Sequence, residues 1–335
     1  MALGNYYIEY CGDFLSVLKP FDPWRSKLCT CPPKYTINPY TGCSHRCLYC
    51  YATAYIKQRK SKPKENIVSR LLNDLRKFDP KYPIDMSLSS DPYPPEEEKY
   101  RVTRKILKIL LPMGVKVQIT TKSDLYLLDI DLISRYNVAV SVTITTLDDS
   151  LARRLEPFAP SPSRRLKALE KLSELGVPFS VRIDPVIPHL NDDPRTLREL
   201  VREVVSIGAQ HIVTSTYKAR PDNFSRMIKE FPELEVKWQK LYYPRGRIKF
   251  GYAYLPVELR KKLLLPVTDE ARKLGVTYAT CREGLLTKEF FNTITCDGAH
   301  LIPIKTQPQN VKQIIKTKHS TLLKFIKLDS QEDHA

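Results

Sequence analysis

The chain has 335 residues, of which 42% are hydrophobic and 27% are charged. These fractions are typical of a soluble globular protein and exclude wholesale disorder. Lysine and arginine total 54 against 37 acidic residues, and the formal net charge of +17 predicts attraction to polyanions, nucleic acid first. No apolar run is long enough for a membrane helix, and the first residues lack the layout of a signal peptide. We therefore expect a cytoplasmic protein.

Short β-branched segments alternate with amphipathic segments through the middle of the chain. The expected strands are residues 34–40, 84–90, 115–122, 138–146, 178–188 and 211–218. The expected helices are residues 51–58, 66–78, 96–111, 129–136, 162–175 and 194–207. Within the helical segments apolar residues recur every three or four positions, as in Leu166, Leu169 and Leu172. This alternation predicts right-handed βαβ units and an α/β fold, a partial (open) βα barrel of about six parallel strands.

The regions on either side of this core are less regular. We expect an N-terminal extension over residues 1–33, the barrel core over 34–220, a helical and strand extension over 221–310, and a charged tail over 311–335. Aromatic residues cluster at positions 6–7 and 21–24 of the first extension. One strand is expected over residues 247–255 of the second extension.

Three cysteines follow the first expected strand. Cys43, Cys47 and Cys50 are separated by three and then two residues, so a short loop can bring their sulfurs towards one point. Thiolates are the usual ligands of iron–sulfur clusters. Three thiolates would leave one iron of a four-iron cluster without a protein ligand, open to a substrate or cofactor. The alternative is a zinc site with His45 as its fourth ligand.

This loop after the first strand of a partial βα barrel resembles the radical S-adenosylmethionine (SAM) superfamily. The wider sequence is similar to the branch that contains spore photoproduct lyase and the DNA repair photolyase-like proteins. The matching stretches are residues 35–51, 89–97, 120–123, 141–146, 155–162 and 182–188. The resemblance implies a [4Fe–4S] cluster on Cys43, Cys47 and Cys50. It also implies reductive cleavage of SAM to a 5′-deoxyadenosyl radical, which abstracts a hydrogen atom.

The matching stretches lie at the C-terminal ends of expected strands, where βα barrels gather their active sites. The candidate SAM-binding residues are Ser90, Asp91, Lys122, Ser123, Ser141, Thr143 and Arg182. Lys122 and Arg182 would bind the SAM carboxylate, and Ser90 and Asp91 would bind its amino group. The remaining hydroxyls would bind its carboxylate or its ribose. Two alternatives stay open, namely that Ser141 and Thr143 only face the barrel interior and that Arg182 forms a structural ion pair with Glu156.

The chain departs from the resemblance at the hydrogen donor. Spore photoproduct lyase uses a cysteine shortly before the aspartate of its second-strand motif, and the corresponding stretch here, residues 86–91, contains none. Tyr49 and Tyr51 flank Cys50 and are the candidate catalytic residues, because a tyrosine can pass on a hydrogen atom.

Five cysteines remain outside the loop, namely Cys11, Cys29, Cys31, Cys281 and Cys296. They are compatible with an auxiliary iron–sulfur or zinc site, with a replacement hydrogen donor, or with simple packing of buried thiols. The sequence leaves these alternatives open.

Basic and aromatic residues adjoin the cysteine loop. Residues 57–64 carry five cations, and a second cationic face comprises Arg101, Arg104, Lys105 and Lys108. The interleaved aromatic residues are Tyr51, Tyr55, Tyr93 and Tyr100. Cations for phosphates and rings for stacking suit flipped or single-stranded bases. We therefore expect a monomer that acts on nucleic acid and takes electrons from a ferredoxin or flavodoxin. The alternatives are radical modification of a peptide or small molecule, and a non-catalytic iron–sulfur or zinc protein that binds nucleic acid.

Overall fold

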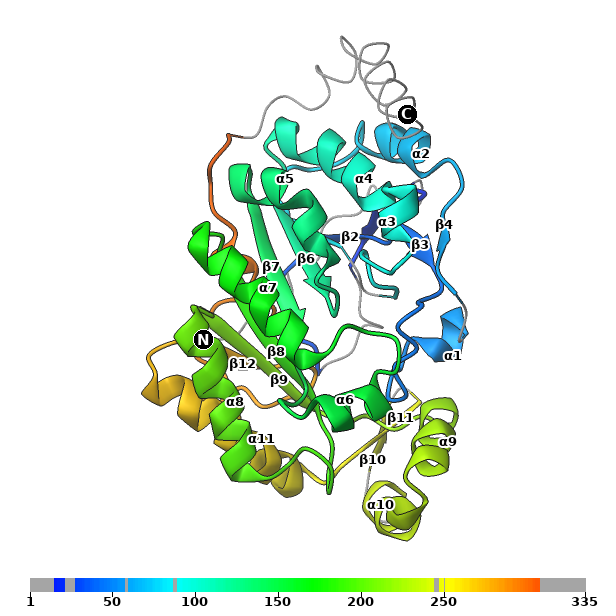
Figure 1. Cartoon of the computed structure of the whole chain (residues 1–335), viewed down its shortest axis with the longest axis vertical. Coiled ribbons are helices and arrows are strands. Elements are labelled where there is room, and N and C mark those ends of the chain that lie inside the picture. The colour runs from blue at the N-terminus through cyan, green and yellow to red at the C-terminus, as the bar shows by residue number, and fades with distance from the viewer. Residues whose placement is uncertain are drawn as a thin grey trace.

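The computed structural model describes residues 15–21, 28–57, 60–86, 89–243, 247–249 and 251–307 (Figure 1). Its strands are β1 (Lys19–Pro20), β2 (Tyr35–Ile37), β3 (Tyr40–Thr41), β4 (Lys62–Pro63), β5 (Ile84–Met86), β6 (Val117–Thr121), β7 (Val138–Thr143), β8 (Phe179–Val186), β9 (His211–Thr216), β10 (Arg247–Lys249), β11 (Tyr252–Tyr254) and β12 (Thr277–Thr280). Its α-helices are α1 (Thr53–Ile56), α2 (Ile67–Asp74), α3 (Glu97–Tyr100), α4 (Val102–Leu110), α5 (Ile130–Arg135), α6 (Asp149–Leu155), α7 (Pro162–Glu174), α8 (Pro194–Ile207), α9 (Pro221–Glu230), α10 (Glu235–Tyr242) and α11 (Val257–Lys273).

An eight-stranded sheet in the order β1-β2-β5-β6-β7-β8-β9-β12 forms the centre of the molecule. Every neighbouring pair from β2 to β12 is parallel, and β1 pairs antiparallel with β2. All six residues of β7 are buried, as expected for a parallel strand covered on both faces. The six strands expected from the sequence are present as β2 and β5–β9. The prediction of an α/β fold with a partial barrel of parallel strands is confirmed.

The helices that connect the strands have clear start and stop signals. In α7 and α8, a Pro occupies the first turn, and the side chains of Ser161 and Asp193 accept backbone N–H bonds there. Gly208, with φ of 122°, ends α8. Helices α7, α8 and α11 lie along one flank of the sheet, and α9 lies between α1 and α10 (Figure 1). Among the described residues, no helix combines the length and apolar character needed to span a bilayer.

Several elements differ from the sequence-based expectation. Strand β12 comes from the expected C-terminal extension, yet it pairs with β9 and adds a parallel strand to the main sheet. The strand expected over residues 247–255 is the antiparallel hairpin β10–β11, and α6 was not expected. These elements are short, so they carry little periodicity. The charged tail over 311–335 and the aromatic residues at 6–7 and 22–24 lie outside the described residues.

Two segments distant in sequence meet at the N-terminal ends of the barrel strands. Lys34, just before β2, forms buried ion pairs with Asp85 of β5, at 2.8 Å, and with Asp297. The Gln118 amide of β6 donates to the Asp297 carbonyl. Gly298, at φ of 87°, lies so close to Ser180 that an added Cβ would approach the serine Oγ to 2.9 Å. Residues before β2 and after β12 therefore close the floor of the barrel.

Candidate functional site

A cavity of about 500 Å³ lies inside the barrel. Side chains from the loops after β2, β5, β6, β8, β9 and β12 line it, together with residues that precede β2. All seven cysteines that the structure describes are on its wall. The cavity also receives acidic and basic side chains, so it can accommodate a zwitterionic ligand.

The cysteine loop follows β3 and is held on both sides. On one side, the backbone N–H groups of Ser44 and Ser61 each donate to the other residue's hydroxyl at 3.0 Å. On the other, Arg226 of α9 donates to the Cys50 carbonyl at 3.1 Å, and Asn223 donates to the Tyr49 carbonyl at 3.1 Å. These bonds engage the loop backbone and leave the thiols of Cys43, Cys47 and Cys50 on the cavity wall.

The donor set of this loop fits an iron–sulfur cluster better than a zinc ion. His45, the only imidazole in the loop, is buried with Nδ1 3.3 Å from the Phe158 carbonyl and Nε2 3.4 Å from the Asp91 carboxylate. Both ring nitrogens therefore face other partners than the three thiols. Three thiolates without a fourth protein ligand match a cluster with one open iron, and the zinc alternative loses its fourth ligand.

Asp91 lies beneath the loop as an acceptor of several hydrogen bonds. It accepts from the Thr121 hydroxyl at 2.6 Å and from the backbone N–H groups of Tyr93 and Lys122 at 2.9 and 2.8 Å. Burial acts to raise the pKa of Asp91, but His45 and these hydrogen bonds outweigh it and bring the pKa to about 2. Asp91 is therefore an anion that fixes the backbone at the end of β6.

Lys122 places a cation on the cavity wall beside the loop. Its Nζ lies 5.6 Å from the centroid of the Tyr49 ring. Burial acts to lower the pKa of Lys122, but Cys47 and Glu156 raise it above its usual value, so the amine stays protonated. The Tyr49 hydroxyl donates to Glu156, which forms a buried ion pair with Arg165. That hydroxyl therefore anchors the loop to α7.

Arg182 on β8 also lines the cavity, paired with a neighbour on its own strand. Its guanidinium lies 2.8 Å from Asp184, whose carboxylate accepts from the Ser215 hydroxyl. Burial acts to lower the pKa of Arg182, and Asp184 more than compensates. The alternative ion pair with Glu156 is wrong, because Glu156 pairs with Arg165 instead.

Tyr51, Ser90 and Thr143 also lie on the cavity wall. The Ser90 hydroxyl donates to the Tyr40 carbonyl at 2.8 Å. This bond uses the single proton of the hydroxyl, and the lone pairs of its oxygen can still accept hydrogen bonds. The Tyr51 ring packs edge-on against Tyr252 at 6.1 Å. All three residues are positioned to contact a molecule in the cavity.

Ser123 and Ser141 are not among the described residues that line the cavity. Ser123 is buried in the turn after β6, where its Oγ accepts the backbone N–H of Leu125 at 3.2 Å. Ser141 is fully buried near the middle of β7 and accepts a hydrogen bond from Ser180 at 2.8 Å. The structure does not bring these two hydroxyls together with the other candidate SAM-binding residues, because both lie away from the described cavity wall.

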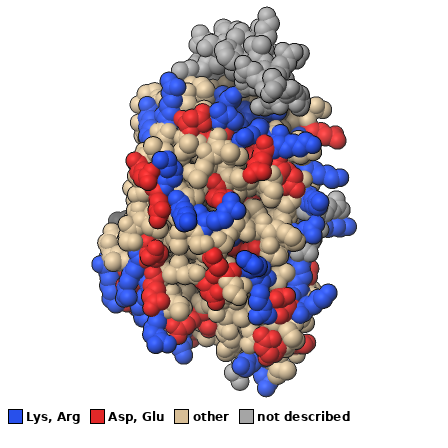
Figure 2. Space-filling view, in the orientation of Figure 1, with Lys and Arg blue, Asp and Glu red and all other residues tan. Residues whose placement is uncertain are grey.

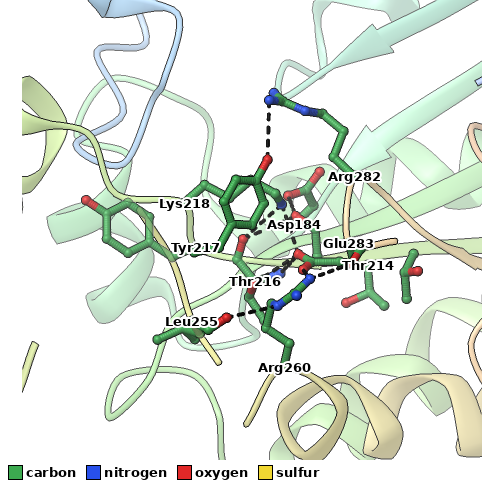
Figure 3. Close-up of polar contacts among 12 residues, drawn as sticks. Asp184, Thr214, Thr216, Tyr217, Lys218, Leu255, Arg260, Arg282 and Glu283 are labelled. Atoms are coloured by element: carbon green, nitrogen blue, oxygen red, sulfur yellow. Dashed lines mark hydrogen bonds and ion pairs between the residues drawn. The ribbon is translucent and has the colours of Figure 1, made fainter. Parts of the chain in front are cut away.

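A buried network at the ends of β9 and β12 was missed in the sequence. The Glu283 carboxylate accepts from Lys218 at 3.0 Å, from Arg260 at 2.9 Å and from the backbone N–H of Thr216 at 2.8 Å. Figure 3 shows Lys218 and Arg260 converging on Glu283. This network fixes the turn that carries Cys281 on the cavity wall. The sequence offered little to find it, because Arg282, Glu283 and Gly284 follow no strand that was expected from the sequence.

The basic run is joined directly to the cysteine loop. Strand β4, within the run, pairs with β3, so that Lys62 lies opposite Thr41. Lys57, Lys60 and Lys62 are exposed. The second cationic face is less available, because Arg104 pairs with Asp129 and Asp131. In Figure 2, basic and acidic side chains are interspersed on the visible face.

Only part of the expected aromatic set can reach a substrate. Tyr55 and Tyr100 are 47% and 41% exposed, and Tyr55 lines the cavity. Tyr93 is fully buried, and its hydroxyl donates to Asp129 at 2.9 Å. The expectation that Tyr93 offers a stacking surface is therefore wrong.

The family model of the radical SAM superfamily matches residues 37–218, which include the cysteine loop and strands β5–β9. The chain belongs to the radical SAM superfamily, as its sequence indicated. Membership implies an enzyme that uses an iron–sulfur cluster and SAM.

Among its relatives, the uncharacterized protein MJ0683 of Methanocaldococcus jannaschii is 39% identical over 48% of this chain. The match covers 62% of that protein, less than two thirds of its length. The radical SAM Nα-GlyT isomerase of Pseudomonas phage M6 is 25% identical over 73% of this chain and 53% of its own.

Among solved structures, a spore photoproduct lyase mutant with bound AdoMet and dinucleoside spore photoproduct aligns with a TM-score of 0.58. The alignment covers 75% of this chain and 78% of the lyase chain at 18% identity. A spore photoproduct lyase complexed with dinucleoside spore photoproduct aligns with a TM-score of 0.57 at 16% identity, over 78% of this chain and 77% of its own. The likeness shows a shared fold.

Proposed function

We propose that this protein is a radical SAM enzyme that abstracts a hydrogen atom from a nucleic-acid base, in repair or modification. The observation that carries the proposal is the cysteine loop itself. Its three thiols share a cavity with charged groups of both signs, and its backbone is bonded to the exposed basic run. A radical source and a binding surface for a polyanion are thereby adjacent.

Cys43, Cys47 and Cys50 would hold a [4Fe–4S] cluster, with the reducing electron delivered by a ferredoxin or flavodoxin. When bound, that cluster would supply the electron that cleaves SAM to a 5′-deoxyadenosyl radical. Lys122 would pair with the SAM carboxylate. Ser90 would accept from its ammonium group through the lone pairs that its bond to Tyr40 leaves free.

Tyr49 and Tyr51 have different roles in this proposal. Tyr49 holds the loop on Glu156, so its hydroxyl is engaged away from the cavity. Tyr51 lies on the wall, packed against Tyr252 and with the guanidinium of Arg282 5.8 Å from its ring centroid. Tyr51 is therefore the better candidate to pass on a hydrogen atom.

Nucleic acid is the favoured substrate class for two reasons, namely the exposed cations near the cavity and the similarity to spore photoproduct lyase. Exposed cations at Lys57, Lys60 and Lys62 suit phosphates, and Tyr55 beside the cavity suits base stacking. The dinucleoside named as bound to spore photoproduct lyase supports the same class.

The decisive experiment follows the hydrogen atom. The anaerobically reconstituted protein is incubated with SAM, a strong reductant and deuterated oligonucleotides, both intact and ultraviolet-irradiated, and products are measured by mass spectrometry. We expect 5′-deoxyadenosine that carries deuterium from the oligonucleotide. Deuterium-free 5′-deoxyadenosine with every oligonucleotide would instead favour a peptide or small-molecule substrate.

The role of the loop thiols is tested separately by Cys43→Ala, Cys47→Ala and Cys50→Ala. Each variant should lose the brown chromophore and form 5′-deoxyadenosine at less than about one hundredth of the wild-type rate, since each removes one cluster ligand. A coloured and active Cys50→Ala protein would refute the assignment.

A further inference from the structure

A second group of thiols lies in the same cavity as the family loop. Cys29 and Cys31 come from the segment before β2, and Cys281 and Cys296 come from the segments after β12. All four line the cavity. Two chain regions more than two hundred residues apart therefore bring four thiols to the barrel interior, and the radical SAM match, residues 37–218, contains none of them.

The four thiols are close to one another, with Cys31 in the middle. The Cys31 and Cys296 sulfurs are 3.3 Å apart. Cys29 is hydrogen bonded to Cys31, and Cys281 lies on the wall of the same cavity. In a tetrahedral zinc site with Zn–S bonds of about 2.3 Å, neighbouring sulfurs are about 3.8 Å apart. The observed sulfur separation is close to that value.

The surroundings can balance the charge of several thiolates. Lys34, Arg182 and Lys218 line the same cavity as the four thiols, so cationic side chains lie beside them. Cys31 and Cys281 are half-buried on the wall, and Cys296 is 1% exposed. Thiolates so close together repel one another unless a cation lies between them.

We propose that Cys29, Cys31, Cys281 and Cys296 form a second metal centre, a four-thiolate site for one thiophilic ion such as Zn²⁺. No three described His, Cys, Asp or Glu side chains are already spaced around one ion, and this holds equally for the family loop. Each thiol moves by rotation about a single Cα–Cβ bond, so loading the site exchanges S–H···S contacts for bonds to the ion and releases protons. The ion would join the segment before β2 to the segments after β12.

The test separates this centre from the family cluster. In the full-length triple variant Cys43→Ala/Cys47→Ala/Cys50→Ala, metal and acid-labile sulfide are measured per chain, and Co²⁺ is titrated in as a visible probe of thiolate ligands. We expect one ion per chain without sulfide, and cobalt–thiolate absorption bands. Adding Cys29→Ser, Cys31→Ser, Cys281→Ser and Cys296→Ser to this protein should remove both the ion and the bands.

Two results would overturn the proposal. One is a triple variant that holds no metal and gives no cobalt bands. The other is iron with matching sulfide, which would replace the single ion by an auxiliary cluster. If the sevenfold variant does not fold, Cys281→Ser or Cys296→Ser added alone to the triple variant should weaken Co²⁺ binding at least about tenfold, and unchanged binding would refute their role. No step uses SAM, so the outcome is independent of the proposed function.

Discussion

At the residue scale, Glu156 is a buried carboxylate on which the cysteine loop depends. Its side chain is 1% exposed, and it accepts from Tyr49, from Thr145 at 3.3 Å and from Arg165. Burial acts to raise the pKa of Glu156, but Arg165 and Lys122 bring it below its usual value. The Glu156 carboxylate therefore stays ionised beneath the loop, and this buried charge depends on its ion pair with Arg165.

Removing Arg165 should lower the stability of the folded protein. Arg165→Leu leaves Glu156 buried without its cation, so we expect the free energy of unfolding to fall by about 3–5 kcal/mol. Denaturant titration of the apoprotein measures this loss of stability. Lys171→Ala, which breaks an exposed pair with Glu174 on the same helix, should cost less than about 1 kcal/mol. Equal losses for the two variants would contradict the importance of burial.

Glu97 predicts a particular pH dependence of stability. Burial raises its pKa from 4.5 to about 7, although Tyr40 and the backbone N–H groups of Thr103 and Arg104 donate to it. The folded carboxyl keeps its proton up to about pH 7, whereas the unfolded one loses it near 4.5. The free energy of unfolding should therefore fall as pH rises through this window, by about 3 kcal/mol from this group.

Glu97→Gln isolates that contribution, because the amide keeps an acceptor oxygen and does not titrate. Denaturant titrations from pH 4 to pH 8 should show that wild type loses stability relative to the variant as pH rises. His211, whose burial lowers its pKa to about 4, acts in the opposite sense but cancels in the difference. Parallel curves for the two proteins would show that Glu97 titrates normally.

At the scale of elements, the segment after β12 closes the barrel floor through one glycine. Gly298→Ala imposes a positive φ on alanine and drives its Cβ against Ser180. Gly176→Ala, after α7, imposes a positive φ with no atom within 4 Å of the added Cβ. We expect Gly176→Ala to cost about 1–2 kcal/mol and Gly298→Ala clearly more, measured by thermal unfolding. Equal losses of stability in the two variants would mean that the Ser180 side chain moves aside without strain.

The elements also show what sequence could and could not predict. The strands from β2 to β9 in the main sheet were predictable because buried parallel strands are apolar runs, and the loop thiols because their spacing is local. Strand β12 has only the four residues Thr277–Thr280 and gives no such run. Ser141 was misplaced because alternation indicates which face of β7 it occupies and not its depth. Pairings such as Lys34 with Asp297 join residues 263 apart and depend on how the barrel closes.

At the scale of the whole molecule, the effect of the net charge of +17 on nucleic-acid binding depends on where the cations lie. If single-stranded nucleic acid binds along the basic run, Lys57→Gln/Lys60→Gln/Lys62→Gln should weaken binding and reduce the slope of log K against log salt by about 2. Filter binding at several salt concentrations measures both effects.

The matched control removes the same charge elsewhere. Lys167, Lys171 and Lys262 are exposed on α7 and α11, on the flank of the sheet. Changing these three to Gln should leave affinity and salt slope close to those of wild type. If both triple variants behave alike, binding reflects total charge alone and the basic run has no special role.

The meeting of two distant segments on the barrel floor has a consequence for synthesis. Residues 28–34 leave the ribosome early, but their partners Cys296 and Asp297 are more than 260 residues away in sequence. During translation the strands from β2 to β9 can assemble while the floor stays open and the interior thiols remain reachable by oxidants. The nascent barrel is therefore most vulnerable in the interval before residue 297 emerges, and chaperones or a reducing environment matter most then.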